Sequence, residues 1–358
     1  MYETKSDRRF SFPFWRLSFI FLFPFWLWVK ADNSSTTRAD FKIHSHHIYL
    51  TSDIFDAYNA TSTILIEIIK PGEFMFLDSS GLEYYASSID DHPLNVTQYS
   101  KDSIRLNNME FQSMNLGNHS IKLAYGRKFE GSGFNMIPNA FGKSTIAFTN
   151  LEPFFAHTVF PCQDYPSFKT VYSSTVHLPT SYLVRFNTIV ESSQTKNGWT
   201  TYNFKETIPL SSYLVAWYIF KASDFYIHTT NVQGIELNII SPFSNYSTVE
   251  WAMKIACRSL KYYSDVFDVS LPISKLDLVP VPNFSSEGME NFGLITIEAT
   301  TLQVQMTSPL LFRQYSAFLI AHEIAHHWFG DVSTMKTFSN LFMNEGYSFL
   351  KNTYLKIL

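Results

Sequence analysis

The stretch His322-Glu323-Ile324-Ala325-His326, followed later by Glu345, is the strongest indication of fold and function in the second half of this 358-residue chain. Residues four positions apart lie on one face of an α-helix, so His322 and His326 can direct two imidazoles at one point. Zinc accepts such nitrogen ligands, and a zinc site that keeps one position open for water needs a third protein ligand. Glu323 is close enough to take a proton from that water. The motif therefore predicts a metal-binding helix that also carries a general base.

Local signals predict where this helix begins and ends. Ser308 is expected as its N-cap, Pro309 as its first-turn proline and Gly330 as its end. A second helix, over about residues 339–355, would return Glu345 to the metal. The alternative is that the pattern is a chance match on a solvated helix face. His327 points away from the ligand face, so we expect it to pack or hydrogen-bond instead of binding metal.

The metal motif resembles a known family over a longer stretch. Residues 322–331 read H-E-I-A-H-H-W-F-G-D and residues 344–347 read N-E-G-Y. They are similar to H-E-x-A-H-Q-W-F-G-N and N-E-G-F of the aminopeptidase N family of zinc aminopeptidases, with the same gap of eighteen residues, 327–344, between the second histidine and the glutamate. The resemblance implies one Zn²⁺ held by His322, His326 and Glu345, with Glu323 as the base.

A second match lies upstream of the helix. Residues 283–294, N-F-S-S-E-G-M-E-N-F-G-L, are similar to the family's exopeptidase motif D-F-x-x-G-A-M-E-N-W-G-L. By this resemblance Glu290 holds the free α-ammonium of the substrate, and Gly288, Met289 and Asn291 contact the substrate beside it. A carboxylate attracts a cation, and a blocked amine forgoes that contact, which makes cleavage amino-terminal. Without the resemblance, Glu290 would be read as an ordinary loop carboxylate.

Shorter matches follow in the family's order along residues 40–358. T-N-L-E-P at 149–153 resembles T-Q-x-E-P, F-P-C-Q-D-Y-P at 160–166 resembles F-P-C-F-D-E-P, and P-L-S-S-Y-L at 209–214 resembles P-M-S-T-Y-L. Asn150 takes the place of the glutamine that helps to grip the substrate amine, and its side chain is one methylene shorter. The ordered set of matches makes the resemblance specific.

The chain also departs from the family pattern. Glu287 replaces the first glycine of the exopeptidase motif and Gly288 its alanine, so an anion stands where the peptide backbone normally passes. Asn340 replaces an aspartate before the third ligand. The family's oxyanion tyrosine lies several tens of residues beyond that ligand, whereas this sequence ends thirteen residues after Glu345 and Tyr354 is too close. Loss of one oxyanion donor costs ~100- to 1,000-fold in rate, so weak activity is expected.

Composition excludes some classes of protein. The chain is 46% hydrophobic and 17% aromatic, which is typical of a folded protein of about two domains. A net charge of −4 and a pI near 6.3 offer no basic surface, so no nucleic-acid partner is expected.

The N-terminus predicts export. Basic residues precede an apolar run of 13 residues at 17–29, which suits a signal-peptide core and is short for a membrane span. Residues 1–31 are therefore a cleaved signal peptide or an uncleaved anchor that ties the chain to a membrane, followed by a polar linker at 32–40. Both readings place the protein outside the cell or at its surface.

Modification and cysteine patterns agree with export. Six N-x-S/T sequons begin at Asn33, Asn59, Asn95, Asn118, Asn245 and Asn283. Asn283 is expected to stay unmodified, because its segment should form an edge strand beside the site. Cys162 and Cys257 are read as free buried thiols, with a disulfide as the alternative.

Residues 41–223 show the pattern of a β-sandwich-like domain. Alternating apolar runs predict strands at 63–69, 120–125, 175–178 and 182–189, with turns at 71–72, 115–117 and 197–198. Residues 224–358 change to a mixed pattern. A capping box at 247–250 opens an amphipathic helix that ends near Asp268, and strands follow at 276–280 and 294–297.

These observations predict an α+β multidomain protein. An N-terminal β-sandwich-like domain precedes a thermolysin-like mixed α/β zinc-peptidase domain that the sequence carries only in part. The expected function is a zinc-dependent aminopeptidase acting on peptides with a free N-terminus. An inactive relative that binds peptides or partners at the cell surface is the alternative, and a fragment of a longer enzyme is a third reading. The sequence indicates no particular oligomeric state.

Overall fold

The computed structural model describes residues 38–54, 56–108, 115–129, 133–140 and 144–353, which belong to the compact unit Thr36–Leu358. The leader predicted at 1–31, the sequon at Asn33 and Tyr354 lie outside the described residues. Among the helices that can be described, none combines the length and the apolar character needed to cross a membrane.

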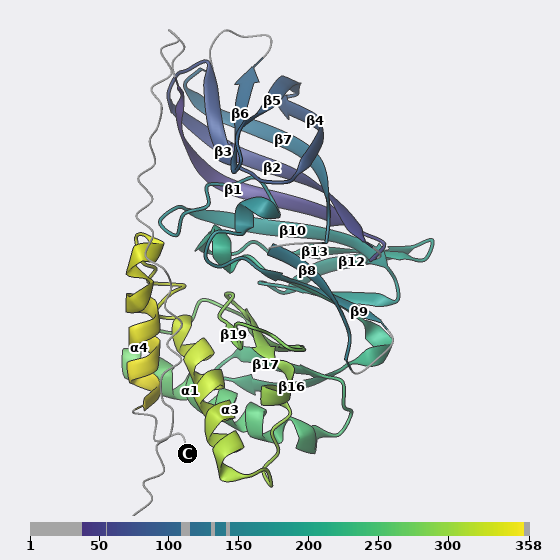
Figure 1. Cartoon of the computed structure of the whole chain (residues 1–358), viewed down its shortest axis with the longest axis vertical. Coiled ribbons are helices and arrows are strands. Elements are labelled where there is room, and N and C mark those ends of the chain that lie inside the picture. Colours follow the sequence, from purple (N-terminus) through teal and green to yellow (C-terminus); the bar gives the residue numbers. More distant parts are fainter. Residues whose placement is uncertain (1–37, 55, 109–114, 130–132, 141–143, 354–358) are drawn as a thin grey trace, which may run out of the picture. The chain divides into compact units, whose positions relative to one another are not determined.

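A long, largely antiparallel sheet forms the first part of the chain, drawn purple to teal in Figure 1. It has 11 strands in the order β12-β13-β10-β1-β2-β7-β4-β5-β6-β3, with β14 paired to β10. The strands are β1 (Asp40–Thr51), β2 (Ala57–Lys70), β3 (Phe74–Asp78), β4 (Glu83–Ile89), β5 (His92–Ser100), β6 (Ser103–Asn108), β7 (Gly117–Lys128), β10 (Lys169–Pro179), β12 (Val190–Lys196), β13 (Trp199–Phe204) and β14 (Pro209–Ser211). Most neighbours are antiparallel, but β1 and β10 run parallel, with Ser45 opposite Val171.

Alternation of side chains places the core on one face of this sheet. Along β2, Tyr58, Ala60, Ile64 and Ile66 are buried while their neighbours Asn59 and Leu65 are exposed. Successive residues of a strand point to opposite faces, so this period of two buries one row of side chains.

A four-stranded sheet packs on that core. Its order is β11-β15-β9-β8, with bounds Tyr182–Phe186, Trp217–Lys221, Thr145–Asn150 and Gly133–Pro138. Trp217 lies among Phe134, Phe160 and Phe186, and its indole N–H donates to Ser174 Oγ of β10 at 2.9 Å. The two sheets therefore share one aromatic core, as in a sandwich.

A mixed five-stranded sheet follows, in the order β16-β17-β18-β20-β19. The bounds are β16 Tyr226–Val232, β17 Ile235–Ser241, β18 Lys275–Val281, β19 Gly288–Met289 and β20 Leu294–Glu298. β17, β18 and β20 are parallel, and every residue of β18 is buried. Parallel strands need cover on their faces, which explains their nearly continuous apolar sequence. β19 pairs only with β20 among the strands described and so forms an edge of this sheet.

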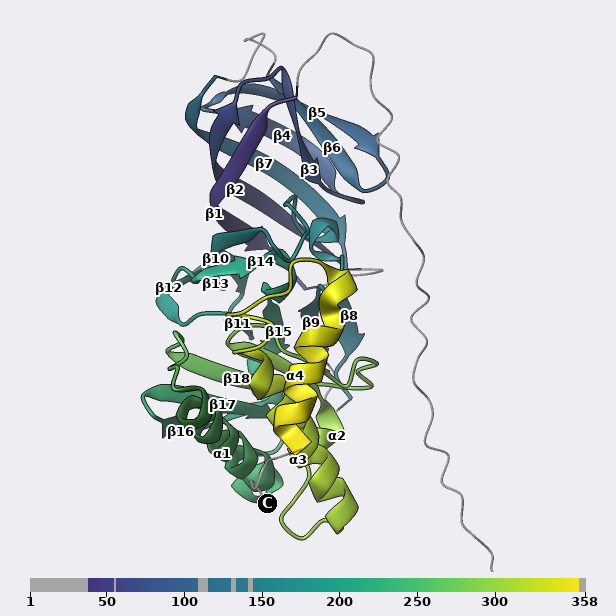
Figure 2. The same ribbon diagram turned by 90° about the vertical axis from the view of Figure 1, so that its left-hand side faces the viewer.

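Helices cover this sheet. They are α1 (Glu250–Phe267), α2 (Ala299–Leu302), α3 (Leu310–His326) and α4 (Leu341–Thr353), with 3₁₀ turns η1 (Ala156–Thr158), η2 (Ser212–Leu214), η3 (Ala222–Asp224), η4 (Tyr246–Thr248) and η5 (Phe338–Asn340). α3 packs against both α1 and α4, and Figure 2 shows α4, in yellow, beside α3. Tyr263 of α1 and Trp328 after α3 join one apolar core with β17, β18 and β20.

The predicted fold class is confirmed, because a β-rich sandwich precedes a mixed α/β region. Several local predictions are wrong. The strand expected at 182–189 ends at Phe186. The capping box does not form: Asn245 caps η4 by accepting from Ser247 N–H, and α1 begins without a side-chain cap. Pro309, and not Ser308, is the N-cap of α3, and the helix ends at His326 before Gly330.

Two further predictions concern single residues. Asn283 lies in an exposed turn with φ +54°, so the prediction that its segment forms an edge strand is wrong. The edge strand therefore gives no reason to expect Asn283 to stay unglycosylated. Cys162 and Cys257 are both free thiols, as predicted, although only Cys162 is fully buried.

Candidate metal and amine site

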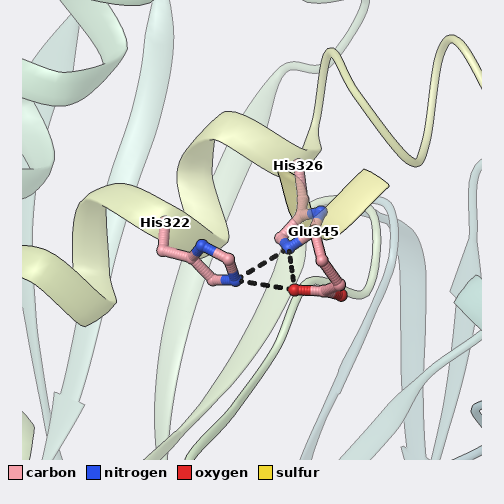
Figure 3. A group of neighbouring side chains, drawn as sticks. All are labelled: His322, His326 and Glu345. Atoms are coloured by element: carbon pink, nitrogen blue, oxygen red, sulfur yellow. Dashed lines mark hydrogen bonds and ion pairs between the residues drawn. The ribbon is translucent and has the colours of Figure 1, made fainter. Parts of the chain in front are cut away.

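The metal-motif residues come together at the end of α3. His322 Nε2 and His326 Nε2 are 3.0 Å apart, and Glu345 Oε2 of α4 lies 3.2 Å from the first and 3.7 Å from the second. Figure 3 shows the two imidazoles projecting from the same helix toward the glutamate. The i, i+4 spacing aligns the histidines, and the packing of α4 against α3 supplies the carboxylate.

These separations can be compared with the requirements of a metal ion. A tetrahedral zinc ion with bonds of about 2.0–2.1 Å places its ligand atoms roughly 3.3 Å apart. The three observed separations, 3.0, 3.2 and 3.7 Å, surround that value. Two imidazole nitrogens and one carboxylate oxygen are also a donor set that zinc uses when its fourth position stays open. The residues present fit a zinc ion.

The second nitrogen of His326 fixes the orientation of its ring. His326 Nδ1 is 3.1 Å from the carbonyl of Phe329 and 3.1 Å from Ser348 Oγ. Donation of the Nδ1 proton to that carbonyl leaves the Nε2 lone pair facing His322 and Glu345, which is the tautomer that a metal ligand needs. His322 stacks on Phe318, and its Nδ1 has no hydrogen-bond partner among the residues described.

The electrostatics of the cluster favour a cation. Burial alone would lower the pKa of His326, but the carboxylates of Glu290 and Glu345 raise it well above its ordinary value. Burial would likewise raise the pKa of Glu345, and its contacts with His322 and His326 lower it far below its usual range. Positive charge is thus stabilised at the point where the three ligands meet.

Glu323 lies beside the cluster and is 4% exposed. Its burial, offset in part by His326, raises the pKa of its carboxyl well above the ordinary value. Gly288 of β19 is in close contact with this side chain, since a Cβ built on Gly288 would lie 2.0 Å from Glu323 Oε1. The absence of a side chain at Gly288 therefore leaves the space that Glu323 occupies.

Glu290 approaches the cluster from the end of β19. It is 3% exposed, its Oε1 lies 3.8 Å from His326 Nδ1, and that oxygen has no hydrogen bond from any described residue. Met289 and Asn291 are also buried, and both amide atoms of Asn291 lack partners within the described part of the chain. Buried polar atoms without partners are uncommon in folded proteins and indicate a place for a ligand.

Residues 150 and 152, from the β-rich region, also lie beside Glu290 and the exopeptidase motif. Asn150, at the end of β9, donates to Ser286 Oγ at 3.4 Å, so it lies beside the exopeptidase motif. Glu152 was not among the residues predicted for the site. Its pKa is raised well above the ordinary value by burial and then by Glu290 and Glu345, and its Oε1 has no hydrogen bond among the described residues. The T-N-L-E-P match contained the signal that could have identified it.

The structure also places the residues that depart from the family pattern. Glu287 is exposed, has φ +63°, and accepts a hydrogen bond from the Tyr315 hydroxyl of α3 at 2.5 Å. Asn340 accepts from the Thr337 hydroxyl at 3.1 Å. His327 is directed away from the ligand cluster, as predicted, and its Nε2 accepts from Gly293 N–H at 3.0 Å.

Comparison with known families assigns the two parts of the chain separately. Residues 42–214 match the peptidase M1 N-terminal domain, and residues 251–356 match the peptidase family M1 domain. Similar proteins include aminopeptidase M1-A of Oryza sativa subsp. japonica, 26% identical over 82% of this chain and 34% of the relative. Endoplasmic reticulum aminopeptidase 2 of Bos taurus is 33% identical over 63% of this chain, and aminopeptidase A of Gloydius brevicauda is 30% identical over 65%.

The H-E-x-x-H sequence on helix α3 is the pattern typical of metallopeptidases, and here it lies in a mixed α/β region that follows a β-rich region. The chain belongs to peptidase family M1, in its aminopeptidase N type. It spans about a third of the length of the rice relative and about a quarter of the bovine and snake relatives.

Proposed function

We propose that the chain is a zinc-dependent aminopeptidase that releases the first residue from peptides with a free N-terminus. One Zn²⁺ would be held by His322, His326 and Glu345. The observation that carries the proposal is the convergence of these three ligands with two buried carboxylates, Glu323 and Glu290, whose atoms also lie within reach of His326. The catalytic domain is proposed to start at residue 224, between the two matched regions.

The protein side chains divide the remaining chemistry between them. Bound zinc polarises a peptide carbonyl and lowers the pKa of water. Glu323 takes the proton of the attacking water and passes it to the leaving nitrogen, a role that suits a carboxyl whose pKa is raised by burial. Gly288 contacts this carboxylate and limits where it can lie.

Glu290 and Glu152 are proposed to bind the substrate amine. An α-ammonium group has three N–H donors, and each of these buried glutamates has an oxygen without a hydrogen bond in the described structure. Charge-assisted hydrogen bonds to the ammonium would satisfy both oxygens. Asn150, Gly288, Met289 and Asn291 border the same place and are proposed as further substrate contacts. An acetylated N-terminus has no such charge, so blocked peptides would be poor substrates.

The protein is proposed to act outside the cell or at its surface. The basic and apolar pattern at 1–31 supports export, by a cleaved signal peptide or as a membrane anchor. The sequons at Asn95, Asn118 and Asn283 are exposed, which agrees with glycosylation of the exported chain.

A second candidate function is a catalytically inactive relative that binds peptides or partners. The observation in its favour is Glu287, an exposed carboxylate held by Tyr315 directly beside Gly288. An anion at this position repels a substrate carbonyl that approaches the edge strand β19.

Glu323→Gln tests the first candidate. We expect the wild-type chain to contain one zinc per molecule and to hydrolyse aminoacyl amides, and the variant to keep its zinc while losing about 100- to 10,000-fold in kcat. Glu250→Gln, an exposed carboxylate of α1, is the matched control. Hydrolysis that survives Glu323→Gln would sink the proposal. Protein that binds peptides without binding zinc and without hydrolysing the peptides would favour the inactive relative.

A further inference from the structure

Three buried polar side chains converge on the backbone of two consecutive residues, Phe292 and Gly293. The Asn187 amide donates to the carbonyl of Phe292 at 2.8 Å, and Lys275 Nζ donates to the carbonyl of Gly293 at 2.8 Å. The N–H of Gly293 donates to His327 Nε2 at 3.0 Å. Asn187, Lys275 and His327 together are called the clamp.

Each member of the clamp is itself held in place. Asn187 also donates to the carbonyl of Leu214 at 2.7 Å and accepts from Ala216 N–H at 2.8 Å. Lys275 also donates to the carbonyl of Phe186 and to Asp277, at 2.5 and 2.8 Å. The clamp residues therefore have little freedom to reorient, and a buried network with its bonds satisfied is rigid.

The third member, His327, combines a hydrogen bond with a ring contact. Its Nε2 accepts the Gly293 N–H, so this nitrogen carries no proton. Its ring stacks on Phe292 with centroids 5.4 Å apart and an interplanar angle of 27°. Its backbone is adjacent to His326, a proposed metal ligand. The same helix end thus touches both the metal cluster and the exopeptidase motif.

The backbone at the clamp leaves no room for adjustment. Gly293 has φ +75°, and a Cβ built on it would lie 2.4 Å from the carbonyl oxygen of Asn187. The N–H of Leu294 donates to the carbonyl of Asn291 at 2.8 Å, which closes a tight turn immediately after Glu290. Fixing Phe292–Gly293 in this turn therefore also restricts the position of Glu290.

The clamp joins three separate parts of the fold. Asn187 follows β11 of the sandwich, Lys275 begins β18 of the mixed sheet, and His327 directly follows the metal-motif helix. The exopeptidase motif lies where two cores meet. Its Met289 and Phe292 belong to the sandwich core, whereas Ile295, the residue after the motif, packs in the core of the mixed sheet.

We propose that Asn187, Lys275 and His327 are positioning residues that set the distance between the amine-binding carboxylate Glu290 and the metal cluster. The proposal rests on the proposed function, because Glu290 is taken as the amine ligand. A fixed distance between the two sites specifies removal of a single residue: the α-amine and the first peptide carbonyl of a substrate must reach Glu290 and the metal together.

Substitution of His327 separates its contact with the Phe292 ring from its contact with Gly293 N–H. His327→Phe also removes the 3.3 Å contact of Nδ1 with the Glu323 carbonyl. His327→Phe keeps a ring against Phe292 but loses the acceptor for Gly293 N–H, whereas His327→Gln restores an acceptor without the ring. His228→Phe removes a histidine contact to the carbonyl of Phe243, on β16 away from the clamp, and is the matched control.

Two readouts on the full chain test the clamp. Hydrogen exchange in peptides that cover residues 288–294 should accelerate about 10-fold or more in His327→Phe, since the protecting bond is lost. Calorimetry with L-leucinamide and N-acetyl-L-leucinamide should show that the preference for the free amine falls about 10-fold in the same variant, while zinc affinity stays unchanged. His327→Gln should recover most of both values.

The outcomes separate this proposal from the proposed function. A wild-type chain without preference for the free amine would contradict the amine role of Glu290, and with it the positioning role. Wild-type preference that persists in His327→Phe would overturn the positioning role alone, whether or not the exchange rate changes. An equal loss of preference in His327→Phe and His327→Gln would also overturn it, because an acceptor at this position would then have no effect on recognition.

Discussion

Among the described residues, nearly all buried polar side chains of the β-rich sandwich are paired, whereas several around the end of α3 are not. In the sandwich, His46 Nε2 bonds Ser62 Oγ at 2.7 Å, and Ser62 in turn bonds the Tyr125 hydroxyl at 3.1 Å. Burial, with a smaller effect of His47, lowers the pKa of His46 to about 3, so the ring stays neutral in this network at neutral pH. These contacts link three neighbouring strands, β1, β2 and β7.

The site shows the opposite pattern. Glu152, Glu290 and Asp331 each have a buried oxygen without a hydrogen bond in the described structure, and Asn291 has two such amide atoms. An unpaired buried polar group costs about 1–3 kcal/mol, and a charged group costs more. A fold that only needed stability would not retain four such residues within one small region. The difference agrees with a sandwich that is stabilised by its polar contacts and with the cationic ligand proposed for the site.

Among the variants that compare these two regions, the largest effect is expected from Gly288→Ala, which fills the space of Glu323. A Cβ at 2.0 Å from Glu323 Oε1 must displace the carboxylate. A displacement of about 1 Å in a catalytic group costs about 100-fold in kcat/KM. The measurement is hydrolysis of an aminoacyl amide at saturating zinc.

Gly346→Ala is the control for this variant. Gly346 follows the proposed ligand Glu345 in α4, and a Cβ there would meet no atom of the described residues within 4 Å. Alanine in a helix is favoured over glycine by about 1 kcal/mol, so the control should be active and slightly more stable. Equal activity in the two variants would contradict the close contact at Gly288.

An intermediate effect is expected in the sandwich from Ser174→Ala. Its hydroxyl accepts from the Trp217 indole at 2.9 Å and donates to the carbonyl of Ile48 at 3.1 Å, so its removal leaves two buried groups unpaired. We expect the free energy of unfolding in urea to fall by about 2 kcal/mol. Ser193→Ala, on the exposed strand β12, should change it little. Equal stability of both variants would show that the sandwich does not depend on its paired polar groups.

The smallest effect, of opposite sign, is expected from Asp331→Asn in the site. Burial, and then the negative charge of Glu290, raise the pKa of Asp331 well above its ordinary value. The folded protein therefore loses stability as the pH rises from about 4 through the raised pKa. Asparagine does not titrate, so the variant should be more stable than wild type by about 1 kcal/mol at pH 8. The gain should be smaller at pH 5.

Urea unfolding of zinc-free protein at both pH values measures this gain. A variant less stable than wild type at pH 8 would show that the Asp331 carboxylate is stabilised in the fold. Asp331 would then no longer count among the four site residues whose unpaired buried groups distinguish the site from the sandwich.

Regular periodicities made much of the fold predictable. The alternation at 63–69 lies within β2 and the apolar run at 276–280 lies within β18, because side-chain period and burial are local properties of a strand. The helix ends were predicted less well. Ser247 and Ser308 have the residue type of a cap, but Asn245 and Pro309 occupy the positions that the folded chain uses. Small energy differences between neighbouring caps decide such boundaries.

The site was predictable where its residues belong to one motif. The grouping of His322, His326 and Glu345 followed from spacing and resemblance, and the structure brings their ligand atoms together. The contacts of Asn187 and Lys275 with residues 292 and 293 carried no such signal. Each contact depends on segments that are distant in sequence meeting at two consecutive residues, and neither hydrophobic periodicity nor a short motif records such a meeting.

The parallel pairing of β1 with β10 has a consequence for how the protein is made. Ser45 pairs with Val171, so β1 emerges from the ribosome well before its second neighbour and presents an open edge until β10 has been synthesised. Pairing over such a long separation is slow, and an exposed edge invites association with other chains. Conditions that delay synthesis between these strands should therefore favour aggregation of the nascent chain, long before α3 or its histidines exist.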